Sequence, residues 1–161
     1  MRKKYNIEVL RIKEINKHTF LDKEKECAVI FCSSYENRLS RCKYAENWLI
    51  MEFDSVGENT FNKNHAELIF KFVNQLSPMI KTIYICTDRG ESRGPAIAAA
   101  LIRYFGYSDK YIWYNYQYHP DPIVYKTLCK TFGVFMPNYL IKYKTHLNNI
   151  SFKKETVKRR K

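Results

Sequence analysis

Residues 84–95 have the sequence YICTDRGESRGP and are followed by the small-residue run 96–100. The apolar, largely β-branched segment 80–86 predicts a buried strand. Pro95 suits the first turn of a helix, where a missing backbone N–H costs nothing, and Gly106 suits the end of that helix. Backbone amides at the start of a helix, together with the helix dipole, favour an anion. This stretch therefore predicts a strand, an anion-binding loop and a helix.

The loop resembles the phosphate-binding loop of the cysteine-based protein-tyrosine and dual-specificity phosphatases, whose pattern is His-Cys-x5-Arg-Ser/Thr between a strand and a helix. In that family the cysteine attacks phosphorus, the arginine holds the phosphoryl oxygens, and the hydroxyl after the arginine supports the leaving thiolate. When Gly90, Ser92 and Arg93 are aligned with this pattern, Thr87 stands at the nucleophile and Cys86 at the histidine. The resemblance is strongest over residues 48–106. It implies that phosphate is bound by Asp88, Arg89, Gly90, Glu91, Ser92 and Arg93.

Two departures from the family pattern bear on activity. A cysteine at a helix N-terminus has a lowered pKa, of roughly 3.5–7.5, and attacks as a thiolate. Thr87 has a hydroxyl instead, which would need an adjacent base. Gly94 replaces the hydroxyl residue that would support a thiolate. Together they predict a pseudophosphatase, a domain that binds phosphate or a phosphorylated ligand without phosphocysteine chemistry.

An active phosphomonoester hydrolase is the alternative. It would use Cys86 in a loop one residue longer, or a hydroxyl mechanism at Thr87. Neighbouring residues of a strand point to opposite faces, so Cys86 is expected in the packing of the sheet if Thr87 faces the loop. A sulphur-transfer loop of the rhodanese type is a more distant alternative, since it also needs a cysteine inside the loop.

Two charged residues are further candidates. The planar guanidinium of Arg93 suits a bidentate phosphate contact, and the alternative is a surface pair with Glu91 or Asp54. The resemblance implies that Asp54 is the general acid, since the family has such an aspartate on the loop about thirty residues before the nucleophile. A general acid is needed because an alkoxide or phenoxide leaves poorly. The alternative is that Asp54 binds its own backbone in a turn.

Three other polar residues have simpler interpretations. Ser33 follows an apolar run, where a strand end would face a ligand crevice, so it could contact a ligand or act within a loop. His65 is interpreted as a packing residue. His119, in a proline-containing turn, could be a catalytic group, but a turn role is the simpler interpretation.

The composition sets limits on the class of protein. Hydrophobic residues make up 45% of the 161 residues, which argues against disorder. No apolar run has the length of a membrane span, and the N-terminus lacks the apolar stretch of a secretory signal. Five cysteines show no tight zinc-ligand pairing, which favours reduced thiols in a cytoplasmic protein. No metal and no cofactor is expected.

The formal net charge of +12 predicts an anionic partner. Part of this charge lies in residues 153–161, which we expect to be a disordered basic tail after a phosphatase-like domain over residues 1–152. A basic module that binds nucleic acid or another polyanion through this tail is a second alternative function.

Apolar runs that alternate with amphipathic segments predict an α/β fold with a mostly parallel central sheet of four to five strands flanked by helices. This prediction matches the dual-specificity-phosphatase-like fold that the loop implies. The predicted strands cover 7–12, 27–32, 48–53 and 80–86. The predicted helices cover 16–21, 64–76, 95–106, 121–131 and 137–147, with a short strand or irregular aromatic segment at 111–114.

Overall fold

The computed structural model describes residues 4–15, 26–33, 47–53 and 60–159. The chain divides into two compact units, of which the first ends at Gly90 and the second begins at Glu91. Within these described residues, the first unit contains a β-sheet with two helices, and the second unit contains four helices. The boundary therefore falls inside the loop that the sequence singled out.

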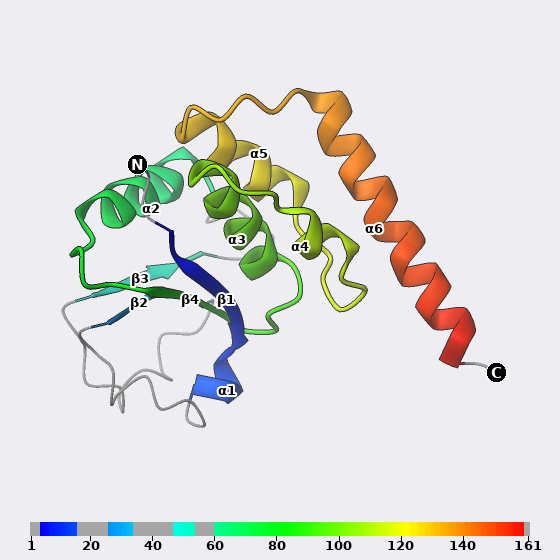
Figure 1. The fold of residues 1–161 in the computed structure, drawn as a ribbon, viewed down its shortest axis with the longest axis horizontal. Helices are drawn as coiled ribbons and strands as arrows, with labels where there is room; N and C mark the ends of the chain where they lie inside the picture. Colours follow the sequence, from blue (N-terminus) through cyan, green and yellow to red (C-terminus); the bar gives the residue numbers. More distant parts are fainter. Residues whose placement is uncertain (1–3, 16–25, 34–46, 54–59, 160–161) are drawn as a thin grey trace. The chain divides into compact units, whose positions relative to one another are not determined.

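The sheet of the first unit has four strands, β1 (Asn6–Arg11), β2 (Cys27–Ser33), β3 (Trp48–Glu52) and β4 (Thr82–Thr87). All neighbouring strands are parallel, and their order in the sheet is β1-β4-β2-β3 (Figure 1). The predicted α/β class with a parallel sheet is confirmed. Strands buried on both faces have near-continuous apolar sequences, and every residue of β2 is buried.

β4 is an interior strand, hydrogen-bonded to β1 on one side and to β2 on the other. Its last residue, Thr87, is in register with Arg11 of β1 and with Cys32 of β2. The carboxyl ends of parallel strands lie at the same edge of a sheet. The end of β4 is therefore flanked by the ends of two neighbours, which fixes the start of the loop.

Two helices are seen in the described part of the first unit. α1 (Ile12–Ile15) follows β1 directly, and α2 (Lys63–Gln75) packs against β3. Asn62 begins α2 by accepting hydrogen bonds from two backbone N–H groups, and Nδ1 of His65 accepts one in return from the Asn62 N–H at 3.1 Å. This reciprocal arrangement is a capping box, with histidine in the position usually taken by Glu or Gln.

The second unit consists of α3 (Arg93–Tyr104), α4 (Lys110–Tyr114), α5 (Pro122–Thr131) and α6 (Asn138–Arg159). α3 packs against α5, and α4 packs against α6. Every residue from 94 to 102 in α3 is buried, as the alanine-rich sequence allows. The small side chains permit close approach of the neighbouring helix.

Two predictions about this unit were wrong. Residues 111–114 form neither a strand nor an irregular segment but part of α4, because Trp113 turns back to bond Asp109 one helical turn earlier. Residues 153–159 are not a disordered tail but the last turns of α6. They contain no glycine or proline, and extending a helix that is already formed adds one hydrogen bond per residue without a new nucleation cost. The predicted helix at 16–21 lies outside the described residues.

Candidate functional site

The first half of the loop, residues 87–90, belongs to the first unit. Thr87 is only 2% exposed, and its Oγ1 accepts a hydrogen bond of 3.1 Å from the Gly90 N–H. Gly90 has φ of +68°, in the left-handed region that glycine adopts without steric cost. The chain therefore turns back so that a backbone amide points at the side chain of residue 87.

Gly90 is also required by its neighbours. A Cβ atom at this position would lie 3.0 Å from Cγ of Arg11 and 3.5 Å from the backbone of residues 10 and 11. The loop thus packs directly on the end of β1. Position 90 has two independent reasons to be glycine, the positive φ and the close approach to Arg11.

Ser33 at the end of β2 holds the second residue of the loop. Its Oγ donates a hydrogen bond of 2.8 Å to Oδ1 of Asp88, and Ser33 is itself 2% exposed. The sequence suggested that Ser33 either contacts a ligand or acts within a loop. The structure supports the second interpretation, because Ser33 bonds a loop residue. The bond directs the Asp88 carboxylate toward the end of β2.

Cys86 lies in the apolar packing of the sheet. It is fully buried and contacts a cluster with Leu10, Val29 and Phe31. Leu10 and Phe31 are its register partners on the two neighbouring strands. Because residues alternate along a strand, Thr87 faces the opposite side of β4 from Cys86. This is the arrangement expected when Thr87 faces the loop.

The second half of the loop, Glu91 to Arg93, belongs to the second unit. The carbonyl oxygen of Glu91 accepts a hydrogen bond of 2.6 Å from the His119 N–H, and that of Ser92 accepts one of 3.3 Å from the Asp121 N–H. Ser92 is the N-cap residue of α3, and its side chain makes no capping bond to the described residues. The start of α3 is therefore fixed by backbone bonds from the α4–α5 connection.

The charged side chains of the loop differ in exposure. Arg93, the first residue of α3, is half-buried, whereas Arg89 and Glu91 are exposed. Arg93 is therefore the more buried of the two loop arginines.

His119 lies in the connection between α4 and α5, after the turn at residues 116 and 117. Besides its backbone bond to Glu91, its ring packs edge-on against Phe152 of α6, with 4.8 Å between ring centroids. These contacts support a structural role for His119, although not within the turn that the sequence suggested.

Asp54, the predicted general acid, lies outside the described residues. The segments on either side of it meet in a cluster in which the ring of His65 lies 5.0 Å from Phe53 and 5.6 Å from Phe61. Burial lowers the pKa of His65 below its ordinary value of 6.5, against a smaller opposing effect of a hydrogen bond with the Glu52 backbone. The interpretation of His65 as a packing residue is confirmed.

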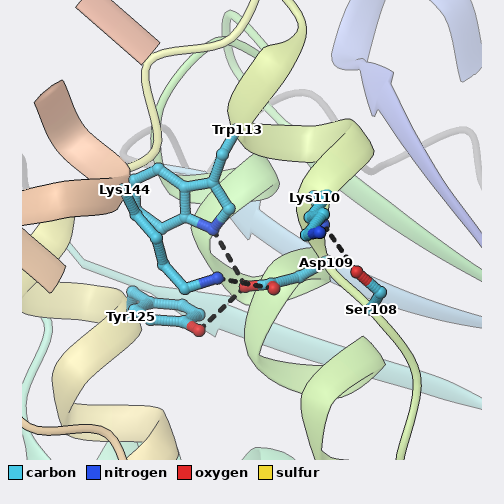
Figure 2. Close-up of polar contacts among 6 residues, drawn as sticks. All are labelled: Ser108, Asp109, Lys110, Trp113, Tyr125 and Lys144. Carbon is cyan, nitrogen blue, oxygen red and sulfur yellow. Dashed lines mark hydrogen bonds and ion pairs between the residues drawn. The ribbon is translucent and has the colours of Figure 1, made fainter. Parts of the chain in front are cut away.

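A buried polar cluster that the sequence did not predict lies in the second unit, centred on Asp109 (Figure 2). Oδ2 of Asp109 accepts hydrogen bonds from Nε1 of Trp113 at 2.9 Å and from the hydroxyl of Tyr125 at 2.8 Å. Nζ of Lys144 lies 2.6 Å from Oδ1 and also contacts the faces of both aromatic rings. The spacing of Asp109 and Trp113, one helical turn apart, was the only local signal for this cluster.

Ionisation within this cluster is strongly perturbed. Burial is the main cause that raises the pKa of Tyr125, and nearby Cys129 and Asp109 add to it. Burial likewise raises the pKa of the Cys129 thiol to about 11. Tyr125 is therefore a neutral hydrogen-bond donor and Cys129 a neutral thiol at physiological pH, so we assign the cluster a structural role.

Comparisons with protein-family models, curated proteins and solved structures found no match to this chain. Among the described residues, no group of three or more His, Cys, Asp or Glu side chains is placed to hold a metal ion. In the same part of the chain, no helix has the length and apolar character needed to cross a membrane.

Proposed function

We propose that residues 87–93 bind a phosphate group, either as the free ion or on a phosphorylated ligand, without forming a covalent phosphoenzyme. The observation that carries this proposal is the hydrogen bond from the Gly90 N–H to Oγ1 of Thr87. It supports a loop in which a backbone amide turns toward the side chain at the position where the resembled phosphatases have their nucleophile. In this proposal the domain is a pseudophosphatase.

The local charges support a site that depends on Arg93. The loop contains two arginines and two carboxylates, so its side chains carry no net charge. Asp88 is bonded to Ser33, and Glu91 is exposed, which supports both carboxylates being directed away from a bound anion. Attraction then comes from backbone N–H groups and from a bidentate guanidinium contact, for which Arg93 is the candidate.

The side chains at positions 86 and 87 support binding without turnover. A threonine hydroxyl becomes a nucleophile only with an adjacent base. The nearest carboxylate in sequence, Asp88, accepts a hydrogen bond from Ser33. Cys86 is in the apolar cluster on the other face of β4, where a thiolate would be desolvated.

Binding is tested by calorimetric titration with inorganic phosphate, sulfate and a phosphotyrosine peptide. Arg93→Ala is expected to weaken phosphate binding at least about tenfold, because a charge-assisted bidentate contact contributes roughly 1.5–3 kcal/mol. Arg89→Ala, which removes an exposed arginine from the same loop, is the matched control and should change binding much less. Equal phosphate affinity of the wild type and Arg93→Ala would show that residues 87–93 are not the phosphate-binding site.

Turnover is tested with p-nitrophenyl phosphate. The wild type is expected to be inactive, and Thr87→Cys, alone or with Gly94→Ser, is expected to gain activity if the rest of the loop is competent. Robust wild-type turnover that is lost in Cys86→Ser would instead establish the alternative, a phosphomonoester hydrolase that uses Cys86.

A further inference from the structure

One side of α6 presents aromatic and basic side chains to solvent. Tyr139 is 68% exposed and Tyr143 is 57% exposed. Residues three, four or seven apart share one side of a helix, and further exposed residues of α6 lie on this side at those spacings. We call this side the outward face of α6. It consists of the exposed residues Tyr139, Lys142, Tyr143, His146, Lys153, Lys154 and Val157.

The opposite side of α6 is fixed to the rest of the second unit. Ile141 and Asn148 are buried there, and Nδ2 of Asn148 donates hydrogen bonds to the carbonyl oxygens of Trp113 at 3.0 Å and Tyr118 at 2.8 Å. Lys144 forms its ion pair with Asp109 on the same side. These contacts set the rotation of the helix and thereby keep the outward face in solvent.

The electrostatic balance of this region is strongly positive. Residues 91–161 contain 13 basic and 4 acidic side chains, so they carry +9 of the total formal charge of +12. Glu155 is the only acidic residue in α6, and it is half-buried on the side away from the outward face. The outward face therefore carries three lysines, Lys142, Lys153 and Lys154, in a helix that has one carboxylate.

We propose that the outward face of α6 binds single-stranded nucleic acid. Lysines at such a face neutralise backbone phosphates, and tyrosines stack on bases, which is the combination that single-strand binders use. α6 has 22 residues and is thus about 33 Å long, enough to follow several nucleotides.

A membrane surface is a poorer fit for this face. A helix that lies on a bilayer needs a broad apolar side of Trp, Phe or Leu opposite its lysines. Here the aromatic residues on the outward face are two tyrosines, Tyr139 and Tyr143, and its exposed aliphatic residue is the small Val157, whereas the larger Ile141 is buried on the other side. Basic and aromatic groups thus share one face, which suits a chain that carries both phosphates and bases.

The electrostatic part is tested by fluorescence anisotropy with labelled oligouridine and oligothymidine of about 12 nucleotides, in salt between about 50 and 200 mM. The triple variant Lys142→Ala/Lys153→Ala/Lys154→Ala removes three charges from the outward face. It should flatten the slope of log K against log salt by about 2, since each phosphate contact to a single strand contributes about 0.7. The matched control is Lys110→Ala/Lys126→Ala/Lys130→Ala, which removes three exposed lysines from α4 and α5 of the same unit.

The stacking part is tested with Tyr139→Ala/Tyr143→Ala. Loss of a stacked base weakens binding roughly 5- to 100-fold, with little change in the salt slope. The control is Tyr111→Ala/Tyr114→Ala, which removes two tyrosines of similar exposure from α4. Circular dichroism checks that every variant retains its helix content.

Several outcomes would overturn the inference. Equal losses in the α6 triple variant and its control would mean that net charge alone attracts the oligonucleotide. Unchanged affinity in Tyr139→Ala/Tyr143→Ala would exclude stacking. Binding to vesicles of phosphatidylserine and phosphatidylcholine with no binding to either oligonucleotide would assign the face to membranes. Arg93→Ala should leave oligonucleotide binding unchanged. The test of the outward face of α6 is therefore independent of the test of phosphate binding by residues 87–93.

Discussion

Nζ of Lys144 and Oδ1 of Asp109 lie 2.6 Å apart in an ion pair whose side chains are 16% and 2% exposed. The pair joins α6 to the residue that begins α4, across 35 positions of sequence. Taking two charges out of water is costly, and here the cost is offset by the ion pair together with the hydrogen bonds that Trp113 and Tyr125 donate to the same carboxylate.

Lys144→Met should destabilise the protein by about 3 kcal/mol, because it leaves the Asp109 carboxylate buried without its cation. Asp109→Asn/Lys144→Met should recover part of this loss, since a neutral amide can still accept from Trp113 and Tyr125. Denaturant unfolding of the two single variants and the double variant measures the coupling, expected at about 1–3 kcal/mol. If the losses in the free energy of unfolding of the two single variants add up to that of the double variant, the interaction between Asp109 and Lys144 contributes nothing to stability.

Gly90→Ala should be clearly more destabilising than Gly133→Ala. Both glycines have nearly the same positive φ, +68° and +67°, so both substitutions incur the left-handed penalty of about 1–2 kcal/mol. Only at Gly90 would the new Cβ also meet Cγ of Arg11, at 3.0 Å, whereas at Gly133 no atom of the described residues lies within 4 Å. Thermal or denaturant unfolding gives the difference, and equal losses would show that Arg11 moves aside freely.

His65 should make the protein sensitive to mild acid. Its folded-state pKa lies below the ordinary 6.5, so the unfolded chain takes up a proton first as the pH falls. The free energy of unfolding is therefore expected to be highest above pH 6.5 and to decrease as the pH falls through the folded-state pKa. Protonation would also remove the acceptor for the Asn62 N–H.

His65→Gln separates this effect from other titrations, because glutamine keeps an acceptor in the capping box and does not titrate. Its free energy of unfolding should fall less steeply below pH 6.5 than that of the wild type. Asn62→Ala should instead lower stability by about 1 kcal/mol at every pH. The same pH profile in wild type and His65→Gln would contradict the assignment.

The described cysteines should be unreactive in the folded protein. Cys27, Cys32, Cys86 and Cys129 are all buried, and Cys42 lies outside the described residues. In a Cys42→Ser variant, labelling by a thiol reagent should be about 1,000-fold slower than in denaturant, since only the unfolded fraction reacts. Fast labelling that mass spectrometry assigns to Cys86 would contradict this expectation and would support the alternative in which Cys86 is the nucleophile.

The strands and the start of α3 could be predicted from the sequence because apolar runs and helix-start residues are local signals. Residues 27–32, for example, are continuously apolar and form a strand buried throughout. The Asp109 cluster could not be predicted, because Lys144 and Tyr125 meet the carboxylate through packing of helices far apart in sequence. The continuation of α6 through residues 153–159 was missed for a related reason. The basic composition of this segment suggests that its side chains repel one another and prevent a helix. It does not indicate that the preceding turns of the helix are held in place by tertiary contacts.

The bond between Ser33 and Asp88 illustrates the same limit at the loop. The sequence placed Ser33 at a strand end but gave no indication which of several polar residues it would meet. The order β1-β4-β2-β3 decides this, because it makes β2 the neighbour of β4. Apolar patterning predicts that strands exist but does not determine their order.

The way α6 is attached has an evolutionary consequence. The rotation of α6 about its own axis is set by two residues. Lys144 forms an ion pair with Asp109, and Asn148 donates hydrogen bonds to backbone carbonyl oxygens. Both interactions are directional and would be broken if the helix rotated. Substitutions on the solvent side are therefore nearly neutral for folding. Descendants of this chain can vary the residues there while inheriting the same scaffold.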